Sequence, residues 1–246
     1  MVDLHSHILP GLDDGPGSME EAVLMARRAA AFNVSHIAAT SHGNYYPYAL
    51  EEYQERFTEL EEVLRGQNIP VKLYPGMEIF VDENTAGLLE KGRLLTLNGT
   101  DYILAEFPFD QSGENVCRQL RKLRDAGYRI VVAHPERYMF IQKETELAYY
   151  LESQGYVLQV NQGSLAGDFG RACKMTAEQL LVSGIARVIA TDAHDTIYRS
   201  HDLQRLMWYL SGMFTSAEIR LWLSENPSRI LKGSSTIGLN TDRKEE

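Results

Sequence analysis

Histidine and carboxylate side chains recur along this sequence at the ends of short apolar segments, where they could bind metal ions. Five of the seven histidines and four acids share this placement: His5, His7, Asp14, His42, Glu78, Glu106, His134, Asp192 and His194. Mixed imidazole and carboxylate ligands suit Mn²⁺, Fe²⁺ or Zn²⁺, and the lack of thiolates beside them argues against a structural zinc site. Nine candidate side chains exceed the needs of one or two ions, so the sequence predicts a site for several.

Each of these motifs has an ordinary structural explanation when it is taken alone. A His-x-His pair on a strand directs both rings to one side, yet such pairs also occur by chance. The Asp-Asp-Gly sequence at 13–15 is typical of a turn, and Asp192 could cap a helix. Glu78 and Glu106 are of a type that usually lies on the surface. The metal-site hypothesis depends on the whole set, because chance would scatter these residues over helices and both ends of the fold.

The elements that would position these residues alternate between apolar segments and amphipathic helices. The apolar segments predict buried parallel strands at Val2–Leu4, His36–Thr40, Val71–Tyr74, Tyr102–Ala105, Ile130–Ala133, Tyr156–Val160 and Arg187–Ala190. Helices are expected at 18–33, 50–65, 114–126, 144–154, 175–183, 202–211 and 216–224. The alternation predicts an α/β fold, a distorted seven-stranded (β/α)7 barrel of the TIM type, with an open doubly wound sheet as the alternative. Barrel enzymes place their chemistry at the carboxyl ends of the strands.

Length and composition narrow the class of protein. The chain has 246 residues, of which 44% are hydrophobic and 24% charged, and this suits one globular barrel domain. A formal net charge of -10 argues against nucleic-acid binding, including that of a metal-dependent nuclease. No segment resembles a signal peptide or approaches the ~18 apolar residues of a membrane span. We therefore expect a cytoplasmic protein that is not integral to a membrane.

The two cysteines do not support a thiol-based phosphatase. Such an enzyme needs a cysteine nucleophile followed six residues later by an arginine, but Cys117 has Leu123 at this spacing and Cys173 has Gln179. Two widely spaced cysteines also make no disulfide framework, which favours a reducing compartment. Both are expected in the core or on helices.

Seven short motifs together resemble the PHP (polymerase and histidinol phosphatase) superfamily. They are His-Ser-His at 5–7, Asp-Asp-Gly-Pro at 13–16, Thr-Ser-His at 40–42, Gly-Met-Glu at 76–78, Ala-Glu-Phe at 105–107, Ala-His-Pro-Glu-Arg at 133–137 and Thr-Asp-Ala-His at 191–194. Within the superfamily the sequence is similar to the CpsB/CapC family, manganese-dependent tyrosine phosphatases of capsule and exopolysaccharide loci. The resemblance spans residues 1–232, the expected PHP domain. The tail at 233–246, rich in Gly, Ser, Thr and charge, is expected to be mobile.

The resemblance implies a site for three ions, with Mn²⁺ expected and Fe or Zn as alternatives. The first ion would be bound by His5, His7, Glu78 and Asp192, the second by Glu78, Glu106 and His134, and the third by Asp14, His42 and His194. Arg137 and Arg199 match the positions at which the family uses arginines to hold the substrate phosphate. For Arg199, a solvated charge in the loop before a helix is an equal alternative.

The activity that the resemblance implies is hydrolysis of phosphotyrosine on a protein, expected to be a bacterial tyrosine kinase that controls capsule or exopolysaccharide synthesis. Two alternatives stay open: a small-molecule phosphatase of the histidinol-phosphatase type, and a non-catalytic metal-binding scaffold. Glu106 favours the protein phosphatase, because many superfamily members have another type of ligand there. The complete ligand set argues against the scaffold. An oligomer is compatible with the sequence, which does not decide the matter.

The expected locations of several other residues follow from their positions in the sequence. Histidine 36 opens a strand and is expected at the opposite end of the barrel, whereas histidine 201 begins a helix and is expected on the surface. Ser18 and Glu21 predict a capping box at the first helix. Five aromatic residues near the candidate ligands could wall a pocket for a phosphotyrosine ring or, with equal weight, pack within loops: Tyr45, Tyr46, Tyr48, Phe107 and Phe109.

Overall fold

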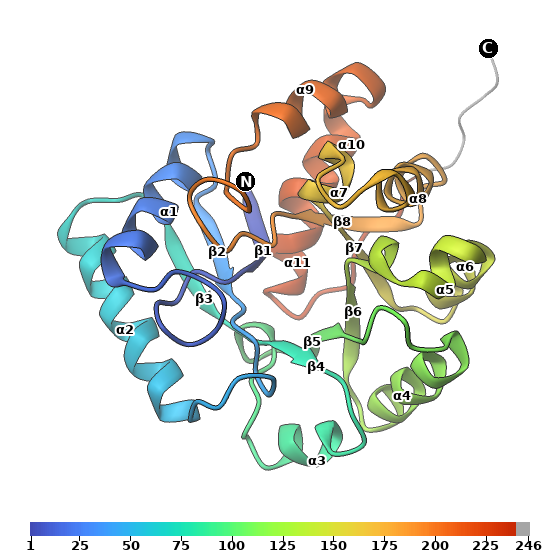
Figure 1. Cartoon of the computed structure of the whole chain (residues 1–246), viewed down its shortest axis with the longest axis horizontal. Coiled ribbons are helices and arrows are strands. Elements are labelled where there is room, and N and C mark those ends of the chain that lie inside the picture. The colour runs from blue at the N-terminus through green and yellow to red at the C-terminus, as the bar shows by residue number, and fades with distance from the viewer. Residues whose placement is uncertain (240–246) are drawn as a thin grey trace.

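The computed structural model describes residues 1–239 and shows parallel β-sheets surrounded by helices (Figure 1). Eight strands are present among these residues: β1 Val2–Ser6, β2 His36–Ala39, β3 Lys72–Pro75, β4 Glu78–Phe80, β5 Tyr102–Glu106, β6 Arg129–Ala133, β7 Val157–Asn161 and β8 Ala186–Ala190. They form a three-stranded sheet, in the order β1-β2-β3, and a five-stranded sheet, in the order β4-β5-β6-β7-β8. Every pairing within the sheets is parallel. The predicted α/β class is confirmed.

The two sheets meet where the carboxyl ends of β1 and β2 lie beside the loop after β8 and the start of β4. Isolated parallel bridges join Ser6 to Ala193 and His42 to Glu78. The first bridge is reinforced by a backbone hydrogen bond, in which His7 N donates to Ala193 O over 2.9 Å. Both points of contact therefore lie among the candidate metal ligands, and the sheets converge where the chemistry is expected.

The predicted closed barrel of seven strands is not confirmed, because the third predicted segment, Val71–Tyr74, forms β3 and is followed by an additional strand, β4, in the other sheet. β3 ends at Pro75 and pairs with β2, whereas β4 begins at Glu78 and pairs with β5. Pro75 has no backbone N–H with which to extend a ladder. Gly76 is packed so tightly that a Cβ atom would lie 2.9 Å from the side chain of Leu97. The turn between the two strands moves the chain from one sheet to the other and sets Glu78 at its start.

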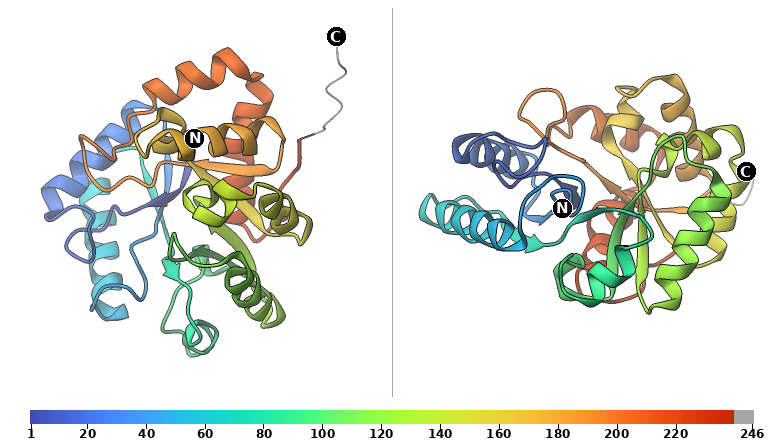
Figure 2. Two further views of the ribbon diagram at one scale, coloured as in Figure 1. Left: turned by 45° about the vertical axis from the view of Figure 1, so that its right-hand side comes forward. Right: turned by 60° about the horizontal axis from the view of Figure 1, so that its bottom comes forward.

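Helices follow most strands and cover the outside of both sheets, as Figures 1 and 2 show. The α-helices are α1 Met19–Ala31, α2 Leu50–Gly66, α3 Thr85–Glu90, α4 Gly113–Asp125, α5 Met139–Lys143, α6 Glu146–Ser153, α7 Gln162–Ala166, α8 Arg171–Val182, α9 Gln204–Met213, α10 Ser216–Arg220 and α11 Asn226–Ile230. Shorter 3-10 turns span Leu97–Gly99 and Pro135–Arg137, and a π turn spans Leu221–Glu225. Within residues 1–239, no helix combines the length and apolar character needed to cross a bilayer.

The strands are buried on both faces, which explains why their sequences are almost continuously apolar. A large apolar cluster fills the space between the strands and the helices. A second cluster joins side chains of different strands, among them Leu4, Leu104 and Val131, with Ile230 of α11. Side chains two positions apart on a strand share a face, so Leu104 is followed on the same face by Glu106. This apolar cluster therefore forms the floor beneath the candidate site.

Both ends of the chain differ in part from the prediction. Ser18 Oγ accepts the N–H of Glu21 over 3.3 Å, but the Glu21 carboxylate accepts from Gly17 N rather than from Ser18, so half of the predicted capping box forms. At the other end, Ile237 N donates to Asn226 Oδ1 over 2.7 Å, so this part of the predicted tail contacts the domain. Residues 240–246 of that tail lie outside the described residues.

Candidate metal centre

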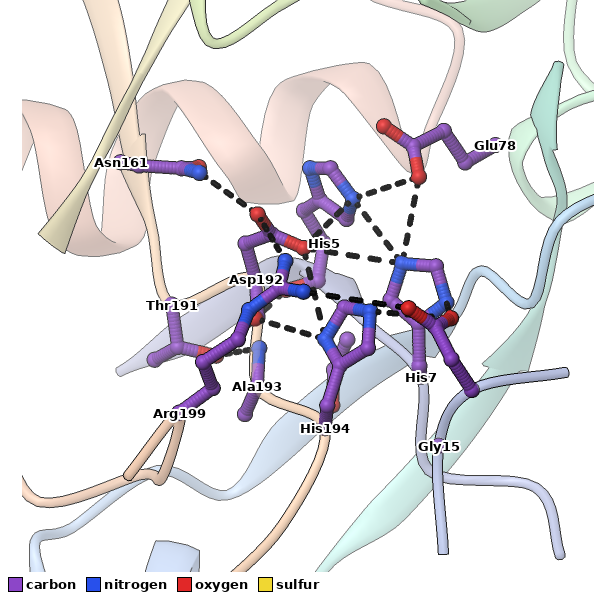
Figure 3. A network of polar contacts seen from close by, with 12 residues as sticks. His5, His7, Gly15, Glu78, Asn161, Thr191, Asp192, Ala193, His194 and Arg199 are labelled. Atoms are coloured by element: carbon purple, nitrogen blue, oxygen red, sulfur yellow. Dashed lines mark hydrogen bonds and ion pairs between the residues drawn. The ribbon is translucent and has the colours of Figure 1, made fainter. Parts of the chain in front are cut away.

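All nine candidate ligands meet in one cluster, eight of them at or after the carboxyl ends of strands and Glu78 at the start of β4. Figure 3 shows His5, His7, Glu78, Asp192 and His194 directed toward one another. Their ligand atoms fall into four overlapping groups of three or four residues, and within each group these atoms lie within 4.8 Å of one another. Most of the nine side chains are buried. The structure thus brings the predicted set together.

The four residues predicted to bind the first ion surround a common centre. His5 Nε2 lies 3.2 Å from Glu78 Oε2 and 3.3 Å from Asp192 Oδ1, and His7 Nε2 lies 3.2 Å from the same Glu78 oxygen. Ligand atoms about 2.0–2.2 Å from one metal ion are separated by roughly 3.0–3.5 Å in tetrahedral or octahedral geometry. His5, His7 and Glu78 are therefore spaced as the ligands of one ion would be, whereas Asp192 groups by distance with His5 and His134.

The second predicted group has the same spacing. His134 Nε2 lies 3.0 Å from Glu78 Oε1 and 3.5 Å from Glu106 Oε1. Glu78 therefore presents one oxygen to each of the first two groups. A carboxylate in this position can bridge two ions, as the predicted sharing of Glu78 requires.

The third predicted group is centred on Asp14. Its Oδ1 atom lies 3.3 Å from His194 Nε2 and 3.6 Å from His42 Nε2. His7 also belongs to this group by distance, and its ring stacks on that of His194 with centroids 3.8 Å apart. Because His42 Nδ1 lies 3.3 Å from Glu78 Oε2 as well, the sharing of ligands between ions remains a prediction.

Hydrogen bonds on the outer side of the rings orient two of the histidines. His5 Nδ1 lies 2.9 Å from Gln159 Oε1, and His7 Nδ1 lies 2.8 Å from Asp13 Oδ2, a residue predicted only as part of a turn. Because these oxygens accept the N–H at Nδ1, the Nε2 atoms are left free to face the cluster as ligands. The buried Nε2 of His194 has no hydrogen-bond partner among the described residues. These features fit a set of metal ligands.

Three buried carboxylates lie close together, which is unfavourable without added positive charge. Burial and the charges of Glu78 and Asp192 raise the pKa of Glu106 to about 8. Burial alone would lower the pKa of His5, but the charges of the same two carboxylates raise it to about 9. Burial lowers the pKa of His134 to about 4. The metal-free cluster therefore compensates its acids by holding protons, which cations would replace.

We expect metal ions to displace protons and to bind more tightly as the pH rises from about 6 to about 8. With pKa values of about 9 and about 8, His5 and Glu106 are mostly protonated at the lower pH, and both must lose a proton to act as ligands. Each displaced proton strengthens the apparent affinity by about tenfold per pH unit below the pKa. Calorimetric titration with Mn²⁺ in buffers of different ionisation enthalpy measures both effects. An affinity that stays constant over this range would contradict these two assignments.

Two candidate ligands have a left-handed backbone conformation that is uncommon outside glycine. φ is 34° at His134 and 53° at Asp192. Such conformations cost roughly 1–3 kcal/mol each and persist where the surrounding structure enforces them. Each residue follows the last residues of a strand, so the sharp change of direction turns its side chain into the cluster. Backbone strain at two ligands is typical of a functional site.

The two arginines predicted to hold a phosphate both lie beside the cluster. Arg199 Nη2 lies 2.6 Å from Asp192 Oδ2, and Arg137 Nη1 lies 3.5 Å from the same oxygen. The Arg137 guanidinium also lies over the rings of Phe109 and Phe169, 4.3 and 4.5 Å from their centroids. These contacts restrain Arg137. Arg199 contacts the cluster instead of extending into solvent, and both guanidinium groups keep further N–H donors for an anion.

Of the five aromatic residues near the ligands, some pack within the fold and others could wall a pocket. Phe107 is fully buried, and Tyr48 donates its hydroxyl to His42 O over 2.6 Å, so both pack within the fold. By contrast, Tyr45 is 63% exposed and Phe109 is 38% exposed. The residues in position to wall a pocket beside the cluster are Tyr45, Phe109 and Tyr46, whose ring stacks on His42.

Sequence reasoning missed the amide pair Gln159 and Asn161 at the end of β7. Gln159 Nε2 donates to Asn161 Oδ1 over 2.8 Å, and Asn161 Nδ2 donates to Asp192 Oδ2 over 2.6 Å. Together with the contact between Gln159 and His5, these bonds form a buried chain that connects two candidate ligands. The available signal was two polar residues at alternate positions of an apolar strand, which places both on one face.

We expect Gln159→Leu to weaken metal binding by about 10- to 100-fold, the usual cost of losing a partner that orients a ligand. The variant removes the acceptor that holds His5 Nδ1–H, so the imidazole can rotate or change tautomer. Isothermal titration with Mn²⁺ and thermal unfolding of the metal-free protein separate this effect from loss of structure. Gln54→Leu on the exposed surface of α2 is the control. Unchanged metal affinity would show that the amide does not position His5.

The predicted position of His201 is wrong. This residue was expected on the surface at the start of a helix, but it is fully buried and lies just before α9. Its Nε2 atom lies 3.1 Å from Ser6 Oγ and 3.2 Å from Asp3 Oδ2, so it joins the loop after β8 to β1 beneath the site. By contrast, His36 lies where it was predicted. It begins β2, whereas the candidate ligand His42 follows the opposite end of this strand.

Known proteins resemble this chain over most of its length. The family described as "Capsular polysaccharide synthesis, CpsB/CapC" matches residues 1–232. The chain is 35% identical over 237 residues to the tyrosine-protein phosphatase YwqE of Bacillus subtilis (strain 168), covering 96% of this chain and 93% of that relative. It is 29% identical over 239 residues to the putative tyrosine-protein phosphatase CapC of Staphylococcus aureus, covering 96% and 91%.

Structural similarity agrees with this relationship. A crystal structure from a study of YwqE from Bacillus subtilis and CpsB from Streptococcus pneumoniae, described as unique metal-dependent tyrosine phosphatases, matches with a TM-score of 0.88. The two sequences are 33% identical, and the match covers 97% of each chain. The similarity therefore includes the whole arrangement of strands and loops that carries the candidate ligands.

Proposed function

Because this chain belongs to the CpsB/CapC family of capsular polysaccharide synthesis proteins, we propose that it is a metal-dependent phosphatase that hydrolyses phosphotyrosine in proteins. The observation that carries the proposal is the convergence of nine ligand-type side chains beside two arginines at one end of the strands. The names of its relatives, tyrosine-protein phosphatases, supply the substrate class. The site supplies the chemistry.

Hydrolysis of a phosphomonoester needs a nucleophilic water and neutralisation of the charge on the phosphoryl oxygens. Divalent ions at the candidate ligands would supply positive charge and lower the pKa of water. Arg137 and Arg199 donate N–H groups to the non-bridging oxygens of the substrate phosphate, in bidentate fashion where both nitrogens reach. A phenolate leaves readily, so the chemistry does not require a strong general acid.

A cysteine nucleophile has no place in this proposal. Cys117 and Cys173 are both buried and free, and burial raises the pKa of each thiol. A reactive thiolate instead needs a lowered pKa and access to substrate. Neither cysteine is among the candidate ligands, and neither is followed six residues later by the arginine that a thiol phosphatase needs. The proposed reaction therefore includes no phosphocysteine intermediate, and water is its nucleophile.

The proposal includes three ions, with Mn²⁺ as the native metal and Fe or Zn as alternatives. The ligand spacings in the three predicted groups support this number, since each group matches the separation of ligands around one ion. Imidazole and carboxylate ligands without thiolate suit Mn²⁺.

In the same proposal, the two parallel sheets are the halves of a distorted seven-stranded PHP barrel, in which β3 and β4 share one position.

The proposed partner is a phosphotyrosine protein, namely a bacterial tyrosine kinase that controls capsule or exopolysaccharide synthesis. The family description, which refers to capsular polysaccharide synthesis, supports this choice. The proposed location is the cytoplasm, where such a kinase domain would be reached and where free cysteines such as Cys117 and Cys173 persist.

A comparison of substrates tests the proposed function. The Mn²⁺-loaded protein is assayed with a phosphotyrosine peptide, the same peptide carrying phosphoserine, and histidinol phosphate. We expect the phosphotyrosine peptide to give a kcat/KM at least about tenfold above the others, because the open site has exposed aromatic side chains for a phenyl ring. A preference for histidinol phosphate would replace the proposal with a small-molecule phosphatase. Metal binding without turnover of any substrate would favour a non-catalytic scaffold.

A further inference from the structure

A cavity of about 460 Å³ lies beside the candidate metal centre; none of the nine candidate ligands lines it, and it shares Arg199 with the proposed phosphate site. Its walls come from the start of α7, the loop after α7, the loop between β8 and α9, and the start of α9: Gln162, Phe169, Ile197, Tyr198, Arg199 and Arg205. The volume is within the ~300–1,000 Å³ range of small-ligand pockets. A larger cavity of about 700 Å³ lies between α9, α10 and residues 237–239, and none of the candidate ligands lines it.

The cavity is continuous with the proposed phosphate site through shared side chains. Arg199 lines the cavity and also contacts Asp192 over 2.6 Å. Phe169 also lines the cavity, and the centroid of its ring lies 4.5 Å from the Arg137 guanidinium. A polypeptide whose phosphotyrosine reaches these arginines would therefore pass the mouth of the cavity with a residue next to it in sequence.

The loop between β8 and α9 displays two large apolar side chains at this cavity. Ile197 is 75% exposed and Tyr198 is 87% exposed. The backbone that carries them is held in place, because Asp195 Oδ1 accepts the N–H of Tyr198 over 2.6 Å and His194 N donates to Arg199 O over 2.7 Å. Exposed apolar side chains on a constrained loop are typical of a contact surface, since little conformational freedom is lost on binding.

The cavity wall includes the side-chain amide of Gln162, which the protein holds in place. Gln162 Nε2 donates to Ser200 O and Asp202 O over 3.2 and 2.8 Å, which fixes the amide. Its Oε1 atom is buried and has no hydrogen-bond partner in the described part of the chain. Because Oε1 is buried, a ligand in the cavity does not reach it without a movement of the side chain. Arg205 is already paired with Asp168 over 3.0 Å, so its charge is largely compensated.

We propose that this cavity is a binding subsite for the polypeptide flanking the phosphotyrosine, and that it accepts an apolar side chain within two residues of it. The walls formed by Phe169, Ile197 and Tyr198 provide apolar contact for this side chain. The inference rests on the proposed tyrosine phosphatase function and adds the class of flanking residue to it.

The test compares the double variant Ile197→Ser/Tyr198→Ser with the unmodified Mn²⁺-loaded protein. The substrates are phosphotyrosine peptides with Leu, Ser or Glu at the two positions on each side, and p-nitrophenyl phosphate, which has no flanking residues. We expect the unmodified protein to prefer the Leu peptide, and the variant to lose about tenfold in kcat/KM for that peptide. Its activity on p-nitrophenyl phosphate and on the Ser peptide is expected to stay within twofold, about the level of assay error.

A matched surface variant controls for general effects of replacing apolar residues. Met175→Ser/Val182→Ser changes two side chains of α8 that are 56% and 51% exposed and do not line the cavity, and we expect no change with any substrate. Equal losses for the Leu peptide and p-nitrophenyl phosphate in the loop variant would overturn the subsite, as would preference for the Glu peptide. Failure of the unmodified protein to hydrolyse any phosphotyrosine peptide would instead refute the proposed function, and the subsite with it.

Discussion

Replacement of Glu78 by Gln is expected to reduce kcat/KM for a phosphotyrosine peptide by at least about 10³-fold, the largest effect expected of a single substitution here. Glu78 is fully buried at the centre of the cluster, with carboxylate oxygens 3.2 Å from His5 Nε2 and 3.0 Å from His134 Nε2. Nearby histidines hold the pKa of Glu78 well below its usual value, although burial opposes this. The neutral amide keeps the shape of the side chain but removes the charge that joins two of the proposed ion sites.

The reduced activity of this variant must be separated from misfolding. Circular dichroism and thermal unfolding of the metal-free protein report the fold, and elemental analysis reports the number of bound ions, which we expect to fall. Glu55→Gln, on the exposed face of α2, replaces the same type of side chain far from the cluster and should behave as the unmodified protein. A Glu78→Gln variant that keeps all its ions and stays within about tenfold of normal activity would exclude Glu78 as a bridging ligand.

Removal of either arginine side chain is expected to lower kcat/KM by about 10²-fold or more, as is usual for a group that stabilises charge in the transition state. Arg199 lies 2.6 Å and Arg137 3.5 Å from the same oxygen of Asp192, so both reach the place where a phosphate would contact the cluster. We expect Arg199→Ala and Arg137→Ala each to show this loss. Lysine at these positions should restore only part of it, because an ammonium group lacks the planar pair of donors.

Metal content distinguishes a role in binding phosphate from a role in holding Asp192. If each arginine binds substrate, the alanine variants retain their ions and lose affinity for inorganic phosphate as a competitive inhibitor. Arg171→Ala, at the exposed start of α8, is the control. A kcat/KM within about twofold of normal in Arg137→Ala would show that this residue is not a phosphate ligand.

The position of the site could be predicted because it follows from where strands end. In a parallel α/β fold the carboxyl ends of the strands converge, so His5, Glu106 and His134 were expected to meet once the apolar segments had been identified. Distances between their ligand atoms were not accessible from spacing in the sequence. The grouping of ligands came from family resemblance, and the structure adds that the three groups have spacings suited to ions.

Other features depend on long-range packing that a local pattern does not contain. The division between β3 and β4 arises where Pro75 ends one ladder and Gly76 packs against a side chain from a distant turn. The left-handed backbone at Asp192 is likewise set by its surroundings. His201 was misplaced because its polarity suggested the surface, whereas burial is made acceptable by Ser6 and a carboxylate of β1.

The most direct test of the account is hydrolysis of a phosphotyrosine peptide by metal-stripped protein, before and after addition of Mn²⁺, with bound ions counted by elemental analysis. The account predicts negligible activity without metal, recovery on adding Mn²⁺, and full activity only as about three ions bind per chain, in line with the nine clustered ligands. Phosphotyrosine hydrolysis that persists after complete removal of metal would contradict it, because the proposed reaction depends on the ions and both cysteines are buried.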